Sequence, residues 1–134
     1  MLAIDTLGET REPLAVLALV PVLSDKSSEV GAAARAALTT ITRHDFGTDS
    51  KKWEAWWQQH KDRHRLEWLI DALTHEQASL RAAASEELKT ITKEFFGYHS
   101  DLPKKEREKA QARYREWWKE VGRVRFSRAS SRGG

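Results

Sequence analysis

Residues 32–47 read AAARAALTTITRHDFG, and residues 82–97 read AAASEELKTITKEFFG. Nine of these sixteen positions are identical at an offset of 50 residues. Identity of this extent between two parts of one short chain indicates an internal repeat. Repeats on this scale are typical of stacked supersecondary units, so we predict two copies of one structural unit.

The similarity extends on both sides of the quoted stretch. Upstream, residues 23–25 (LSD) correspond to residues 73–75 (LTH) at the same offset. Downstream, residues 52–57 (KWEAWW) correspond to residues 113–118 (RYREWW) at an offset of 61, because the second copy has 11 additional residues around 101–111. The same order of features in both copies makes a chance origin improbable.

The apolar spacing in each copy predicts three helices. In the first copy, a helix over residues 13–24 is expected to be buried on most sides and kinked at Pro21. A second begins at Ser27 or Ser28, runs to about Arg43 and is followed by Gly47 as a C-terminal stop. A third, tryptophan-rich helix follows Asp49 or Ser50. The expected apolar stripe of the second helix consists of Val30, Ala33, Ala34, Ala37, Leu38 and Ile41.

The second copy repeats this order over residues 63–73, 78–93 and 103–121. Its apolar positions are again spaced by three and four residues, as on one helix face. No segment alternates with period two for long enough to indicate a strand. The predicted fold class is all-α. The expected core residues are Leu66, Leu69, Ile70, Leu73, Leu80, Ala83, Ala84, Leu88, Ile91, Ala110, Tyr114, Trp117, Trp118 and Val121.

The first copy resembles a HEAT repeat of the kind found in bacterial lyase-like repeat proteins. The resemblance rests on Leu17-x-x-Val20-x-x-Leu23-x-Asp25 and on the stripe of the following helix, and residues 66–92 resemble the same pattern. Residues 2–9 look like the end of a preceding repeat. The resemblance implies an α-α superhelix, a helical solenoid of about two units plus a partial N-terminal one. We expect this domain to span residues 1–122, followed by a basic, disordered tail over residues 123–134.

Composition narrows the classes of function. The chain has no cysteine, which excludes disulfides, thiolate metal ligands and a cysteine nucleophile. It has no glycine-rich phosphate loop and no constellation suited to hydrolysis. His60 and His64 are four residues apart, a spacing that metal ligands use, but a helix break near Asp62 is expected to separate them. His75 is followed by Glu76, and this is the single His-Glu dipeptide in the chain. We therefore expect a protein that is not an enzyme and uses no cofactor or metal.

Neither a signal peptide nor a membrane-spanning run is visible in the sequence. The longest apolar run, residues 14–23, is ten residues long and contains Pro21. Cytoplasmic localisation is the resulting expectation.

The expected function is that of a protein-protein interaction or scaffold module. In HEAT repeats the second helices usually line the concave face, so the resemblance places a polar band there. Its members lie off the apolar stripes and are spaced by four residues. Trp56 and Trp117 occupy equivalent positions and are expected to be the more exposed tryptophans. The candidate partner-binding residues are Arg35, Thr39, Arg43, Ser85, Lys89, Lys93, Trp56 and Trp117.

The alternative is a nucleic-acid-binding module. Residues 1–103 contain 12 Lys and Arg against 16 Asp and Glu, whereas residues 104–134 contain 11 Lys and Arg against 4 Glu. Clustered cations attract phosphates, and salt weakens that attraction. Up to Val121 the cations alternate with glutamates. The arginines that no neighbouring acid opposes are Arg123, Arg125, Arg128 and Arg132.

Overall fold

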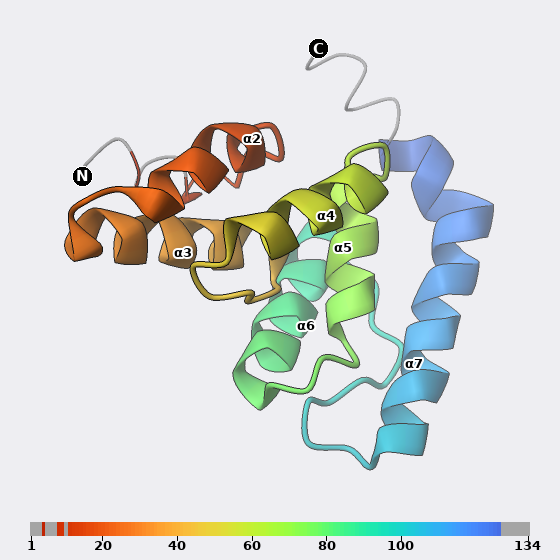
Figure 1. The fold of residues 1–134 in the computed structure, drawn as a ribbon. Coiled ribbons are helices and arrows are strands. Elements are labelled where there is room, and N and C mark those ends of the chain that lie inside the picture. Colours follow the sequence, from red (N-terminus) through yellow and green to blue (C-terminus); the bar gives the residue numbers. More distant parts are fainter. Residues whose placement is uncertain (1–3, 5–7, 10, 127–134) are drawn as a thin grey trace. The chain divides into compact units, whose positions relative to one another are not determined.

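The computed structural model describes residue 4, residues 8–9 and residues 11–126. Within these residues the protein is all-helical, with six α-helices and no strand (Figure 1). The chain divides into two compact units, residues 1–65 and 66–134. No helix in the described part of the chain is both long enough and apolar enough to cross a membrane. The predicted fold class, all-α, is confirmed.

Unit 1 contains the three elements predicted for the first copy. Helix α2 (Ala15–Leu19) continues as a 3-10 helix, η1 (Val20–Ser24), with Pro21 in its first turn. Helix α3 (Ser28–Thr42) follows, and α4 (Ser50–His60) carries three buried tryptophans. Proline lacks an amide hydrogen and disrupts an α-helix interior, which explains why the kink expected at Pro21 takes the form of a change in helix type.

Side chains just outside α3 and α4 define where these helices begin. The Ser27 hydroxyl accepts a hydrogen bond from the Val30 amide, and the Asp49 carboxylate accepts one from the Lys52 amide. Both are N-caps that satisfy amides with no partner inside the helix. At the other end, α3 stops at Arg43, which adopts the left-handed conformation with φ 57°. The helix therefore ends near Arg43, as predicted, but the left-handed residue that ends it is Arg43 and not Gly47.

Unit 2 repeats the order with α5 (Arg65–Ala72), α6 (Ala78–Thr92) and α7 (Lys104–Trp117), after which Trp118–Gly122 form a π-helical turn, η2. In Figure 1, α7 runs alongside α5. The core contains leucines of α5 and α6 together with aromatic residues of α7. Tyr98, from the α6–α7 loop, donates its hydroxyl to the Leu73 carbonyl and is fully buried.

The turn after the second helix has the same hydrogen bonds in both units. Thr42 donates its hydroxyl to the Leu38 carbonyl and accepts from the His44 amide. Thr92 makes the equivalent pair with Leu88 and Glu94. These threonines are buried, so their hydroxyls need such partners.

An aromatic residue of the third helix closes each turn. In unit 1 the Trp53 indole donates to the Gly47 carbonyl at 2.9 Å and lies edge-on to Phe46. In unit 2 the Tyr114 hydroxyl donates to the Glu94 carbonyl at 3.0 Å and lies edge-on to Phe96. Each unit thus closes the same loop with a different aromatic residue. The internal repeat predicted from the sequence is therefore a repeat of local structure.

Three expectations about burial are wrong. The first helix is not buried on most sides, since Leu14 and Leu17 are 67% and 56% exposed. Leu14 and Leu17 are three residues apart and lie on the opposite side of the helix from its buried residues, Ala15, Val16 and Leu19. Ile91 and Val121 are also largely exposed, at 39% and 47%.

The boundary expected at residue 122 also needs correction. Helical structure continues through residues 123–126, because Phe126 packs against Trp117 and Trp118 and so extends the core of unit 2. The remainder of the expected tail, residues 127–134, lies outside the described residues.

Stability at alkaline pH is expected to depend on Tyr114. Burial, assisted by the Glu94 carboxylate, raises the pKa of Tyr114 to about 12. In the unfolded chain this tyrosine ionises near about pH 10. The protonated side chain therefore contributes its full stability below about pH 10, and that contribution is lost as the pH rises towards about 12. Tyr114→Phe should lack this pH dependence, and at neutral pH it should cost about 0.5–1.5 kcal/mol for the lost hydrogen bond.

Urea unfolding at several alkaline pH values, followed by circular dichroism, measures both effects. Tyr98 is present in both proteins, so its own contribution cancels in the comparison. Parallel pH profiles for the wild type and Tyr114→Phe would contradict the prediction.

Gly122 is expected to be required for the packing of η2. A Cβ at this position would lie 2.7 Å from Trp117 Cζ3 and 2.7 Å from Trp118 Cε3. Both rings are buried and cannot withdraw without disturbing the core. Gly122→Ala should lower the free energy of unfolding by about 1–3 kcal/mol, as overpacking does elsewhere. Val121→Ala, at the exposed neighbouring position, is the matched control, and a more stable Gly122→Ala protein would contradict the prediction.

Candidate functional site

The polar residues predicted on α3 are engaged within their own unit. Arg35 forms a two-pronged ion pair with Asp45, at 2.9 Å from Nε to Oδ1 and 2.8 Å from Nη2 to Oδ2. This pairing raises the pKa of the Arg35 guanidinium above its ordinary value. The Thr39 hydroxyl donates to the Arg35 carbonyl, and Arg43 is the left-handed residue at the helix end. Arg35 is therefore a fixed cation beside a carboxylate rather than an isolated positive charge.

The equivalent residues of α6 differ in exposure. Ser85 is buried at 7% exposure, whereas Lys93 is exposed at the helix end. Lys89 lies 3.5 Å from a Glu86 carboxylate oxygen and 5.2 Å from the centre of the Phe95 ring. Ser85 and Lys89 also line a hollow of about 230 Å³ within unit 2. The band expected along α6 is thus reduced to its two lysines.

Trp56 and Trp117 are not exposed, so this expectation is wrong. Their exposed fractions are 6% and 8%, and the other four tryptophans are equally buried. Trp56 stacks on the His60 ring with centroids 4.4 Å apart. The orientation of an amphipathic helix about its own axis decides which of its residues are buried. In α4 and α7 this orientation places Trp56 and Trp117 in the core of their own unit.

The histidines do not form a metal site in the described structure. Residues 61–63 break the helix after His60, as predicted. The His60 ring lies 2.7 Å from the Trp56 carbonyl oxygen, and His75 accepts from the Gln77 amide. Among the residues that the structure describes, no group of three or more potential ligands gathers to hold a metal ion.

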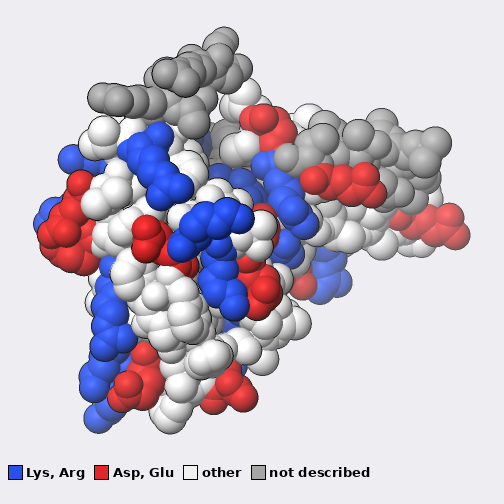
Figure 2. Space-filling view, turned by 180° about the vertical axis from the view of Figure 1, so that it is seen from behind, with Lys and Arg blue, Asp and Glu red and all other residues white. Residues whose placement is uncertain are grey.

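The arginines of the nucleic-acid alternative fall in two places. Arg123 and Arg125 are exposed on the last helical turn, and the Arg125 guanidinium lies 4.9 Å from the centre of the Phe126 ring. Arg128 and Arg132 lie outside the described residues. On the face shown in Figure 2, Lys and Arg side chains are interspersed with Asp and Glu side chains.

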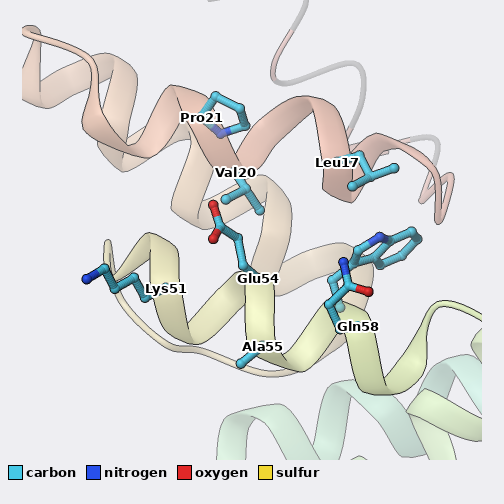
Figure 3. A pocket seen from close by; sticks show the side chains of 8 residues that line it. Leu17, Val20, Pro21, Lys51, Glu54, Ala55 and Gln58 are labelled. Atoms are coloured by element: carbon cyan, nitrogen blue, oxygen red, sulfur yellow. The ribbon is translucent and has the colours of Figure 1, made fainter.

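A groove that the sequence did not predict lies between α2–η1 and α4 of unit 1 (Figure 3). Its volume is about 510 Å³, which is in the range of ligand-binding pockets. We call it the α2–α4 groove, and it is lined by Leu17, Val20, Pro21, Lys51, Glu54, Ala55, Trp57 and Gln58.

The two walls of the α2–α4 groove differ in chemistry. The α2–η1 wall is apolar and presents Leu17, Val20 and Pro21. The α4 wall is mixed, and in Figure 3 the Glu54 and Gln58 side chains point from it towards the apolar wall. An apolar surface with a few polar groups at its edge is typical of a recognition site.

At the corresponding position in unit 2, polar side chains of the third helix contact the first helix. There Gln111 of α7 is buried and donates to the Ile70 carbonyl at 2.9 Å, to the Asp71 carbonyl at 3.3 Å and to the Thr74 hydroxyl at 3.1 Å. Arg115 forms an ion pair with the Asp71 carboxylate at 3.0 Å. Polar contacts therefore join α7 to the C-terminal end of α5 and the turn after it.

Unit 1 has a weaker version of the same bridge. Ser50 and Ser24, which correspond to Gln111 and Thr74, have hydroxyl oxygens 3.4 Å apart. Glu54 and Pro21 stand where unit 2 has Arg115 and Asp71. The sequence therefore contained a signal for the groove. The oppositely charged pair at positions 71 and 115 of the second copy has no counterpart at positions 21 and 54 of the first copy.

Comparison with known proteins gives no relative for this chain. No protein-family model matches it, and no curated protein and no solved structure is significantly similar.

The bridge in unit 2 is expected to depend more on Gln111 than on Arg115. Gln111→Ala removes donors to three buried or half-buried oxygens, which should cost about 1–3 kcal/mol of unfolding free energy. Arg115 is 55% exposed, so water screens its ion pair and Arg115→Gln should cost less than about 1 kcal/mol. Urea denaturation of the two variants decides between them. A larger loss in Arg115→Gln would show that the ion pair dominates.

Proposed function

We propose that the chain is a non-catalytic protein-interaction module built from HEAT-like helical repeats. The duplicated helix pairs, the alanine-rich second helices and the aromatic closure of each turn support this proposal. In such repeats each unit buries its apolar face against the next and leaves an extended surface for a partner.

The α2–α4 groove is the observation that carries the binding proposal. It combines about 510 Å³ of space with an apolar wall, and Leu17 at its edge is 56% exposed. The nearby Leu14 is 67% exposed. Exposed leucines beside a groove between helices resemble sites in which a partner segment inserts apolar side chains. We therefore propose this groove as the principal docking surface.

The polar band of the second helices plays the lesser part in this proposal. Ser85 is buried, and Arg35 is paired with Asp45. Binding to this ion pair would require a partner to compete with a carboxylate already in place. The band is therefore the weaker candidate for the source of a partner's affinity.

Replacement of Leu17 by glutamate tests the proposal. Glutamate occupies the equivalent position 67 in unit 2, so the fold accommodates it. Peptides selected from a random displayed library on the full chain provide the probe. Their affinity for Leu17→Glu, measured by fluorescence polarisation, should fall about tenfold or more because an apolar anchor is lost.

Val124→Glu is the matched control, since Val124 is 53% exposed and lies outside the groove. It should bind the selected peptides as the wild type does, and both variants should keep the wild-type unfolding midpoint. Failure to select any peptide sensitive to Leu17→Glu would refute the proposal. Duplex DNA binding that collapses between low and moderate salt would favour the nucleic-acid alternative.

A further inference from the structure

Residues at equivalent positions of the two copies can be compared at the α2–α4 groove. In unit 2 the third helix offers Arg115, the first helix offers Asp71, and the two side chains form an ion pair. In unit 1 the equivalent residues are Glu54 and Pro21. Proline has no charge to offer, and the charge on the third helix is reversed. Unit 1 therefore presents an acid where unit 2 presents a base that is already paired.

The Glu54 carboxylate is available within the groove. Figure 3 shows its side chain directed from α4 towards Val20, whereas the Lys51 side chain points away from it. Among the described residues, Glu54 has neither a hydrogen bond from another side chain nor an ion-pair partner. The Glu54 side chain is exposed, so an incoming group can reach its carboxylate. A cation entering the groove would meet a single unpaired acid beside an apolar wall.

We infer that the occupant of the α2–α4 groove is a segment of a partner protein that carries an arginine or lysine close to a leucine-like side chain. The inference rests on the proposed function and specifies the chemistry of its ligand. The cation pairs with Glu54, as Arg115 pairs with Asp71 in unit 2. The apolar side chain lies against Leu17, Val20 and Pro21.

Arginine suits this position better than lysine. Its planar guanidinium can donate two parallel hydrogen bonds to a carboxylate, and its flat faces tolerate apolar neighbours. Gln58 lines the same groove four residues further along α4, on the same side of the helix. Its amide oxygen can accept a further hydrogen bond from a guanidinium or from the backbone of the bound segment.

Three variants test the inference with peptides selected from a random displayed library on the full wild-type chain. Sequences that combine Arg or Lys with Leu, Ile or Met should dominate the selection. Glu54→Arg should weaken their binding about tenfold or more, since like charges then face each other. Asp62→Arg makes the same change of charge at an exposed site outside the groove, and it should bind within about twofold of the wild type.

The double variant Pro21→Asp with Glu54→Arg transfers the ion pair of unit 2 into unit 1. It should close the groove and abolish binding of the selected peptides while it keeps the helical content and the unfolding midpoint of the wild type. A new affinity of the single Glu54→Arg variant for Leu-and-Glu peptides would further support the role of charge.

The outcomes separate this inference from the proposed function. Peptides whose binding is lost in Leu17→Glu but unchanged in Glu54→Arg would leave the groove as a docking site and overturn the cation inference. An absence of any peptide sensitive to Leu17→Glu would overturn both. Self-association of the wild type in sedimentation, abolished by Glu54→Arg, would identify a second copy of the chain as the occupant and overturn the inference of a partner segment.

Discussion

In each unit, one aromatic side chain holds the third helix against the turn that precedes it. Trp53 does so through its indole nitrogen and the Gly47 carbonyl, and Tyr114 does so through its hydroxyl and the Glu94 carbonyl. Seven residues separate α3 from α4 and eleven separate α6 from α7, so this contact helps to fix the direction in which the third helix leaves the turn. The orientation of α4 and of α7, and hence of the α4 wall of the groove, depends on this closure.

The sequence predicted the class of the fold and the bounds of the longer helices, because apolar spacing, N-caps and the repeat all pointed to the same answer. Ser27 and Asp49 cap the helices that they were expected to cap. The exposure of single residues was harder to predict. Whether Trp56 faces the core or the solvent depends on a rotation of α4 of less than half a turn, and local spacing does not determine that rotation.

The groove was not predicted for a related reason. Its wall residues come from segments some thirty positions apart in the sequence. The sequence pattern of each segment alone is that of an ordinary helix. The difference between the copies is visible in their sequence alignment, since Pro21 aligns with Asp71 and Glu54 with Arg115. Only the ion pair observed between Arg115 and Asp71 gives that alignment a physical meaning. Duplication has kept the closure of the turn and altered the contact between the first and third helices.

The left-handed residues that end α3 and α6 are both basic, Arg43 with φ 57° and Lys93 with φ 62°. Glycine is the usual residue in this conformation, and a side chain with a Cβ atom is strained there by about 1 kcal/mol. A cation at the carbonyl end of a helix offsets part of that strain, since the helix dipole concentrates negative charge at this end. Replacement of Arg43 or Lys93 by glycine would therefore relieve backbone strain and raise the thermal stability of its unit. Each replacement would also remove one positive charge from the surface.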